Sequence, residues 1–224
     1  MHYKLLSYII DENTPLYGNT PVPKILHHNR ISSGNHTNSV ILSIHNHTGT
    51  HIDASKHFID SGKKISDYST DQLIFVNPII VNCPTGKGSL ITPQDLHSKE
   101  HELQIADFLI FLTGFGRFRN EQIYKTHNPG ISPETILWIR EYFPNIRCIG
   151  IDSISISSYQ HREIGREAHN AAFFEGEKMG APLLLVEDMK LDEVSNKIIK
   201  KIFILPWLIK DIDSAPCSIL AEVI

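Results

Sequence analysis

Four histidines and one aspartate crowd a short stretch in the first quarter of the chain. The run HNHTGTHIDASKH contains His45, His47, His51 and His57, with Asp53 among them. Neutral imidazole and carboxylate are donors that suit zinc, manganese or iron, and no cysteine lies among them. This pattern favours a metal site. The alternative is a histidine-rich surface turn that takes up metal only adventitiously.

No regular element would bring these side chains together. On a helix, Asp53 would point well away from His47 and His51. On a continuous strand, His47 and His57 would lie ~33 Å apart, at ~3.3 Å per residue, whereas a metal accepts ligands only at ~2.0–2.2 Å. We therefore expect a sharp turn at Gly49, which permits unusual backbone angles. That turn would fold His51 and Asp53 back beside His47.

Three ligands of N, N, O type leave coordination positions open, which is typical of a catalytic site. Such a site lowers the pKa of a bound water to about 7. His57, four residues after Asp53, suits a general acid or base because imidazole titrates near neutral pH. His45 is expected to support the site or to lie at the surface. Tyr17, in a glycine-containing turn, is either a packed surface aromatic or the wall of a substrate pocket.

Composition bounds the class of protein. The chain has 224 residues, 41% of them hydrophobic and 21% charged, which predicts one globular domain over residues 1–224. The net charge of −4 offers no basic footprint for nucleic acid. Three scattered cysteines indicate free thiols in a reducing compartment. No apolar run approaches ~18–20 residues, so we expect no membrane span and a cytoplasmic protein.

Hydrophobic periodicity and helix caps predict a mixed α/β (α+β) domain. A polar, irregular loop is expected over residues 27–39, and a strand over residues 40–47 leading into the motif. The other expected strands are residues 3–10, 72–83 (an edge strand or bulge because of Pro78), 108–115, 146–156, 183–186, 198–205 and 218–223. The expected helices are residues 93–102, 132–143 and 168–179.

The central run also carries a resemblance. His47-Thr-Gly-Thr-His51-Ile-Asp53-Ala-Ser-Lys-His57-Phe resembles the H-x-G-T-H-x-D-x-P-x-H-F signature of the cyclase family of metal-dependent hydrolases, which includes bacterial kynurenine formamidases and isatin hydrolases. Ser55 stands where relatives usually have proline; the change should loosen the turn without removing a chemical group. The likeness extends more thinly to residues 17–21, 149–153, 184–189 and the closing Leu205-Pro206, Ala215-Pro216 and Ala221.

The resemblance implies a swivelling β/β/α-type fold, a zinc site of one or two ions with manganese possible, and a dimer or tetramer. Its first metal ligands would be His47, His51 and Asp53, with Asp53 bridging two ions where two are bound. His57 would transfer protons.

A distal histidine and glutamate complete the site in the family, and His169 and Glu187 match them best. Glu175 and Glu177 are rivals for the acidic ligand, because relatives often have a shorter gap between the two residues. We prefer Glu187, since an apolar strand would deliver it rigidly.

These observations lead to the hypothesis of a metal-dependent hydrolase that opens an amide of a small, aromatic substrate, with N-formylkynurenine as the leading candidate. Tyr17 would hold the substrate ring. One alternative keeps the site and changes the substrate to an isatin-like lactam or to a cyclisation or dehydration reaction. Another is a metal-binding or interaction protein that has lost turnover, although the presence of His57 argues against it.

Overall fold

The computed structural model describes residues 2–176 and 179–224. Its strands are β1 (His2–Leu5), β2 (Lys24–Asn29), β3 (Ser39–Ser43), β4 (His51–Asp53), β5 (Ile74–Phe75), β6 (Pro78–Asn82), β7 (Leu90–Ile91), β8 (Phe108–Leu112), β9 (Gly130–Ile131), β10 (Cys148–Ile151), β11 (Leu184–Glu187), β12 (Ile199–Pro206) and β13 (Ser214–Val223). The α-helices are α1 (Glu100–Leu103), α2 (Gln122–Thr126), α3 (Pro133–Tyr142) and α4 (Arg162–Phe173). Short 3-10 helices are η1 (Ile31–Ser33), η2 (Ser55–His57), η3 (Ile65–Asp67), η4 (Thr70–Leu73), η5 (Pro93–Lys99), η6 (Phe115–Phe118) and η7 (Tyr159–His161).

One large sheet organises the fold, in the order β5-β12-β13-β4-β11-β10-β8-β6, with β1 paired to β13. Its β6, β8, β10 and β11 strands run parallel, whereas β4 joins β11 and β13 antiparallel. Parallel strands covered on both faces read as continuous apolar runs, as the buried Phe108–Leu112 does. Pro78 begins β6, the last strand in that order, which confirms the edge predicted from a residue that cannot donate to a ladder.

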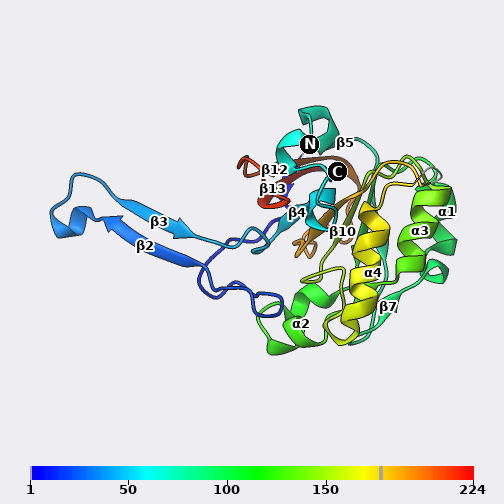
Figure 1. Ribbon diagram of the computed structural model, residues 1–224, viewed down its shortest axis with the longest axis horizontal. Helices are drawn as coiled ribbons and strands as arrows, with labels where there is room; N and C mark the ends of the chain where they lie inside the picture. The colour runs from blue at the N-terminus through cyan, green and yellow to red at the C-terminus, as the bar shows by residue number, and fades with distance from the viewer. Residues whose placement is uncertain (1, 177–178) are drawn as a thin grey trace.

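Alternate residues of the central strands enter two different cores. Leu109 and Ile149 pack with Ile136 of α3 and Ala168 of α4. Phe108 and its neighbours on the opposite face pack with apolar residues of β12 and β13 instead. Figure 1 shows α3 and α4 side by side over one flank of the sheet. The predicted mixed α/β fold is therefore confirmed.

The chain turns sharply before β4, as the motif predicts. Gly49 has φ +65°, and an added Cβ there would lie 3.1 Å from a side-chain carbon of Ile10. Both the left-handed backbone and the close approach favour glycine. The turn ends at His51, where β4 begins and pairs with β11 on one side and β13 on the other.

The expected strand over residues 40–47 and the loop over residues 27–39 are wrong in detail. β3 ends at Ser43, so neither His45 nor His47 lies on a strand. β2 covers Lys24–Asn29 and pairs with β3 in a separate two-stranded sheet. This hairpin projects far from the body of the molecule (Figure 1). Apolar alternation indicates a strand, but it cannot show that the strand pairs outside the main sheet.

The predicted start of a helix is correct for α3, which has a capping side chain, and wrong for α4, which has none. Ser132 accepts a hydrogen bond from the backbone N–H of Thr135, and α3 begins at the next residue, as predicted. The expected helix over residues 168–179 is wrong at both ends, because α4 begins at Arg162 without a side-chain cap and ends at Phe173. The expected helix over residues 93–102 is a 3-10 segment followed by one α-helical turn. Within the described residues, no helix is long and apolar enough to cross a membrane.

Candidate metal centre

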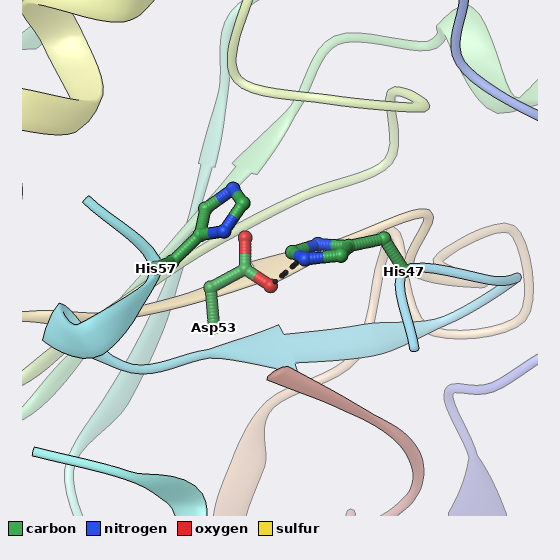
Figure 2. Close-up of side chains that lie close together, drawn as sticks. All are labelled: His47, Asp53 and His57. Atoms are coloured by element: carbon green, nitrogen blue, oxygen red, sulfur yellow. Dashed lines mark ion pairs between the residues drawn. The ribbon is translucent and has the colours of Figure 1, made fainter. Parts of the chain in front are cut away.

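The predicted side chains gather at β4. Figure 2 shows the carboxylate of Asp53 between the rings of His47 and His57. Nδ1 of His47 lies 3.2 Å from Oδ1 of Asp53, and the two imidazole rings are 4.2 Å apart between centroids. One ligand atom from each of these three residues lies within 4.8 Å of the others. The same holds for His51, Asp53 and Glu187, so Asp53 belongs to both groups.

Strand pairing explains why His51 meets Glu187. β4 and β11 are antiparallel, and these two residues are directly opposite each other. Opposed residues point to the same face, which places Nε2 of His51 3.4 Å from Oε2 of Glu187. Asp53, two residues along β4, shares that face and lies 3.6 Å from the same nitrogen. Ile52 points into the core and is fully buried.

Helix α4 brings the last predicted residue. Nε2 of His169 lies 3.5 Å from Oε1 of Glu187, and Phe58 stacks on the His169 ring at 4.9 Å. The same carboxylate oxygen accepts hydrogen bonds from Ser155 Oγ at 2.9 Å and from the Ile156 N–H at 2.8 Å. These donors hold Glu187 in place between the sheet and the helix.

Backbone carbonyls select which nitrogen of two histidines faces the cluster. Nδ1 of His51 lies 2.8 Å from the carbonyl oxygen of Gly49, and Nδ1 of His169 lies 2.9 Å from that of Gly165. A carbonyl oxygen only accepts, so each Nδ1 carries a proton and each Nε2 is left for the cluster. Metal-ligating histidines are held in this way, with the second ring nitrogen bonded to a carbonyl or carboxylate.

The cluster leaves buried polar atoms without hydrogen-bond partners. They are Nε2 of His51 and both carboxylate oxygens of Asp53, although Oδ1 of Asp53 is within ion-pair distance of His47. A buried polar atom left unpaired costs about 1–3 kcal/mol. A divalent cation would satisfy these atoms, and imidazole nitrogens with carboxylate oxygens form a donor set that suits zinc or manganese. The residues present therefore fit a metal.

The charges of the cluster also favour a bound metal ion. Burial acts to lower the pKa of His47, but the carboxylates of Asp53 and Asp213 outweigh it and raise the pKa to about 10. Burial acts to raise the pKa of Glu187, but His169 and His51 hold it at about 2. Burial also acts to raise the pKa of Asp53, but His47 and His51 outweigh it and hold this pKa well below its usual range. The carboxylates thus stay ionised and attract positive charge.

Asp213 is a site residue that the sequence did not reveal. Its Oδ2 lies 2.8 Å from Nδ1 of His57 and 3.2 Å from Nε2 of His47. The side-chain amide of Asn46 donates to Oδ1 of Asp213 at 2.8 Å. The backbone carbonyl of Asp213 accepts a hydrogen bond from the Ala54 N–H at 2.9 Å. Asp213 precedes β13, 156 residues after His57, and no local pattern marks it. Only the pairing of β13 with β4 could have placed it here.

A cavity of about 380 Å³ adjoins the cluster, and Tyr17, Phe58 and Ile154 contribute to its walls. This volume suits a small molecule. The Tyr17 ring meets Tyr159 edge-on at 5.8 Å. Burial, reinforced by Glu187, raises the pKa of Tyr17 to about 12, so its hydroxyl stays protonated.

The other residues named as candidates from the sequence are His45, Glu175 and Glu177. His45 lines the cavity, and its Nδ1 accepts from the His47 N–H at 3.3 Å. Glu175 is exposed and lines a separate cavity with Lys63, so it is not brought to the cluster. Glu177 lies outside the described residues.

The fold and the cluster together define a mixed α/β protein with a centre of imidazoles and carboxylates at β4, in the middle of the strand order of the large sheet. Residues 5–158 match the family model described as "Cyclase". The chain belongs to the cyclase family.

Its relatives are hydrolases. The chain is 29% identical over 195 residues to the kynurenine formamidase of Geobacillus thermodenitrificans, covering 85% of this chain and 83% of that protein. The structure of isatin hydrolase A from Labrenzia aggregata superposes with a TM-score of 0.82 at 20% identity, over 98% of this chain and 93% of that one. A structure described as a potential metal-dependent hydrolase with cyclase activity has a TM-score of 0.75 at 21% identity, over 98% and 96% of the two chains.

Proposed function

We propose that this protein is a metal-dependent hydrolase that cleaves the amide C–N bond of a small aromatic substrate. The observation that carries the proposal is the set of buried, unpaired ligand atoms at His51 and Asp53 beside a cavity of small-molecule size. Kynurenine formamidase relatives at modest identity support the class of reaction.

The ligands we propose are His47, His51, Asp53, His169 and Glu187, for zinc or manganese. Two overlapping groups share Asp53, which would allow one or two ions. A bound divalent cation supplies Lewis-acid polarisation of a carbonyl oxygen and makes water ionise near neutral pH. The carboxylates of Asp53 and Glu187 would balance the charge of the cation. The backbone carbonyls that contact Nδ1 of His51 and of His169 keep Nε2 of each ring directed towards the cluster.

His57 is the proposed proton-transfer residue. Because Asp213 accepts only, the 2.8 Å contact assigns the proton of His57 to Nδ1 and leaves Nε2 free. In hydrolysis, the oxygen of water bonds to the carbonyl carbon, the C–N bond breaks, and the nitrogen gains a proton. Nε2 of His57 takes a proton from water and returns one to the leaving nitrogen. Asp213 fixes the tautomer and stabilises the imidazolium that forms between the two transfers.

The cavity supports an aromatic substrate. Tyr17 and Phe58 offer ring surfaces to it, and aromatic pairs are stabilised in stacked or edge-on geometry. N-formylkynurenine is the substrate we propose first, giving kynurenine and formate. An isatin-like lactam presents the same bond within a ring, and it is the second candidate because the same groups would act on it.

A substrate screen on metal-loaded protein tests the proposal. N-formylkynurenine, isatin and formanilide are each followed by absorbance, with chelator-treated protein as the control. We expect turnover of at least one of them that disappears with the metal and returns on reconstitution. No metal-dependent hydrolysis of any of the three would remove the aromatic-amide assignment. A protein that binds stoichiometric metal yet turns over nothing would instead support a binding protein without catalytic activity.

A further inference from the structure

The cavity beside the metal centre carries opposite charges at its two ends. The buried carboxylates of Asp53 and Glu187 line its inner end, at the proposed ligand cluster. Among the described residues that line the cavity, Arg162 and Arg166 are the two with permanent positive charge, and both are exposed to solvent. A bound metal ion would balance the inner carboxylates, which leaves unbalanced positive charge at the mouth.

Helix α4 places both arginines on the face that carries His169. Positions 162, 166 and 169 have the i, i+4, i+7 spacing of a single helix face, and these three residues of α4 line the cavity. At about 1.5 Å of rise per residue, Arg162 lies roughly 10 Å from His169 along the helix axis. An aromatic ring with a short substituent on either side spans a distance of this order.

Arg162 is held in position without being neutralised. Its guanidinium lies over the ring of Tyr159, 3.9 Å from the centroid, and Tyr159 in turn meets the Tyr17 ring edge-on. In the part of the chain that the structure describes, Arg162 forms no ion pair with a carboxylate. A guanidinium stacked on a ring keeps the N–H groups at its edge available, and these can bind a carboxylate through two parallel hydrogen bonds.

The other charged groups near the mouth already have partners. Nη1 of Arg166 contacts the two carboxylate oxygens of Glu163 at 2.8 and 2.6 Å, but this pair is exposed and therefore weak. Asp188, which also lines the cavity, accepts a hydrogen bond from Nη2 of Arg119 at 2.7 Å. Its charge is thus balanced within the protein, and it does not compete for Arg162.

We propose that Arg162, supported by Arg166, binds a carboxylate of the substrate while the amide lies at the metal centre. The protein would then select aromatic amides that carry an acid group, with the ring beside Tyr17. This inference rests on the hydrolase function proposed above and narrows its substrate class. N-formylkynurenine has a carboxylate remote from its formamide, whereas isatin and formanilide have none.

A matched pair of substrates tests the proposal on metal-loaded, full-length protein. N-formylkynurenine and its methyl ester share the reacting amide and differ in the charge of the carboxyl group. We expect kcat/KM to be at least about tenfold higher for the acid, because hydrogen bonds between charged partners are strong. Arg162→Gln should bring this ratio close to one by raising KM for the acid, and should leave kcat and the kinetics of the ester unchanged. A general loss of structure would slow both substrates alike.

Arg117→Gln is the matched control. Arg117 is also an exposed arginine over an aromatic ring, 4.6 Å from the centroid of Phe118, but it does not line the cavity. The ratio of acid to ester should stay at the wild-type value in this variant. An equal loss of the ratio in Arg117→Gln would show that the preference comes from the overall charge of the protein, and would overturn the proposal.

Binding of kynurenine gives a measurement that does not depend on turnover. Kynurenine keeps the ring and the carboxylate but has no formamide to hydrolyse. Titration calorimetry on metal-loaded protein should show that Arg162→Gln raises the Kd of kynurenine at least about tenfold and leaves that of its methyl ester unchanged.

The two measurements separate failure of the carboxylate site from failure of the hydrolase function. Kynurenine binding that depends on Arg162, in a protein that hydrolyses neither substrate, would support the carboxylate site and remove the hydrolase function. Equal hydrolysis of acid and ester would do the reverse. A preference for the acid that persists in Arg162→Gln would also overturn the proposal, because the metal would then bind the carboxylate. So would a protein that binds no kynurenine.

Discussion

The metal centre and the arm formed by β2 and β3 over residues 24–43 contrast in what they bury and what they expose. At the centre, polar atoms of His51 and Asp53 are buried without partners. On the arm, aliphatic side chains such as Leu26 and Ile41 lie in water. Burial without a polar partner calls for an ion, whereas exposure of apolar surface calls for a protein surface. The two regions therefore call for different partners, an ion at the metal centre and a protein surface at the arm.

The two regions also differ in what holds them. β4 is hydrogen-bonded to strands on both sides, β11 and β13, so substitutions at the centre should remove chemistry and leave the fold. Within the described part of the chain, β2 and β3 pair with each other and with no other strand, so substitutions there should leave the chemistry unchanged. Each prediction below tests one side of this contrast.

Asp53→Asn should have the largest effect. The amide keeps the shape but loses the charge shared by both ligand groups. We expect metal affinity to fall by more than about a hundredfold, beyond the range for groups that only orient ligands, and turnover to fall with it. Elemental analysis after dialysis measures the metal. Asp211→Asn, at an exposed acid that pairs with Lys64, is the control and should retain full metal content. Stoichiometric metal in Asp53→Asn protein would show that Asp53 is not a ligand.

His57→Gln should abolish most turnover and leave the metal in place. Loss of a general acid or base slows catalysis by about 10²–10⁴-fold, while the other proposed ligands remain. Asp213→Asn should give a smaller loss of the same kind, because an amide can donate to Nδ1 of His57 and stabilise the wrong tautomer. Steady-state kinetics with parallel metal analysis separates the roles. If His57→Gln loses metal as well, His57 is a ligand, as its grouping with His47 and Asp53 would permit.

Metal affinity should depend on pH in a direction set by His47. Its pKa is raised to about 10 in the metal-free protein, so a metal must displace a proton from it at neutral pH. Protons and metal compete for the nitrogen, and affinity should rise about tenfold per pH unit below pH 10. The raised pKa also stabilises the metal-free fold below pH ~6.5, the unfolded value, and this contribution is lost as pH rises towards 10. Thermal melts of metal-free and metal-loaded protein across this window should therefore converge at low pH and diverge at high pH. Affinity that does not change with pH would exclude His47 as a ligand.

The smallest effect should come from the arm in isolation. Leu26→Ala should change the free energy of unfolding by less than about 0.5 kcal/mol, as substitutions at exposed positions do. Ile52→Ala, behind the centre in β4, should cost about 2–5 kcal/mol because Ile52 is fully buried. Urea titration measures both. A large cost for Leu26→Ala would contradict the exposure of this side chain and mean that it is packed against another surface.

Sequence patterns predicted much of this molecule where the cause was local. Gly49 forces the turn, and Ser132 caps α3, so both appear where expected. His47, His51, Asp53 and His57 were found because they lie within one short run, whereas His169 and Glu187 were predicted only from the family resemblance. By contrast, Asp213 reaches His57 only because β13 pairs with β4. Contacts set by the order of strands leave no trace in local spacing.

The arm shows a related limit. His27 and His28 lie in a polar context that suggests a loop, yet they belong to β2 because β3 pairs with it. Arg162 opens α4 without a capping side chain, so the helix begins six residues before the expected position. For β2, the pairing with β3 and not local preference determines the element.

The central claim is that His47, His51, Asp53 and their neighbours bind a catalytic metal. Anomalous diffraction from crystals of the protein soaked with Zn²⁺, recorded on both sides of the zinc absorption edge, tests it most directly. We expect one or two strong peaks within bonding distance of Nε2 of His51 and a carboxylate oxygen of Asp53. Crystals that take up zinc only at surface histidines such as His27 and His36, with none at Asp53, would contradict the account.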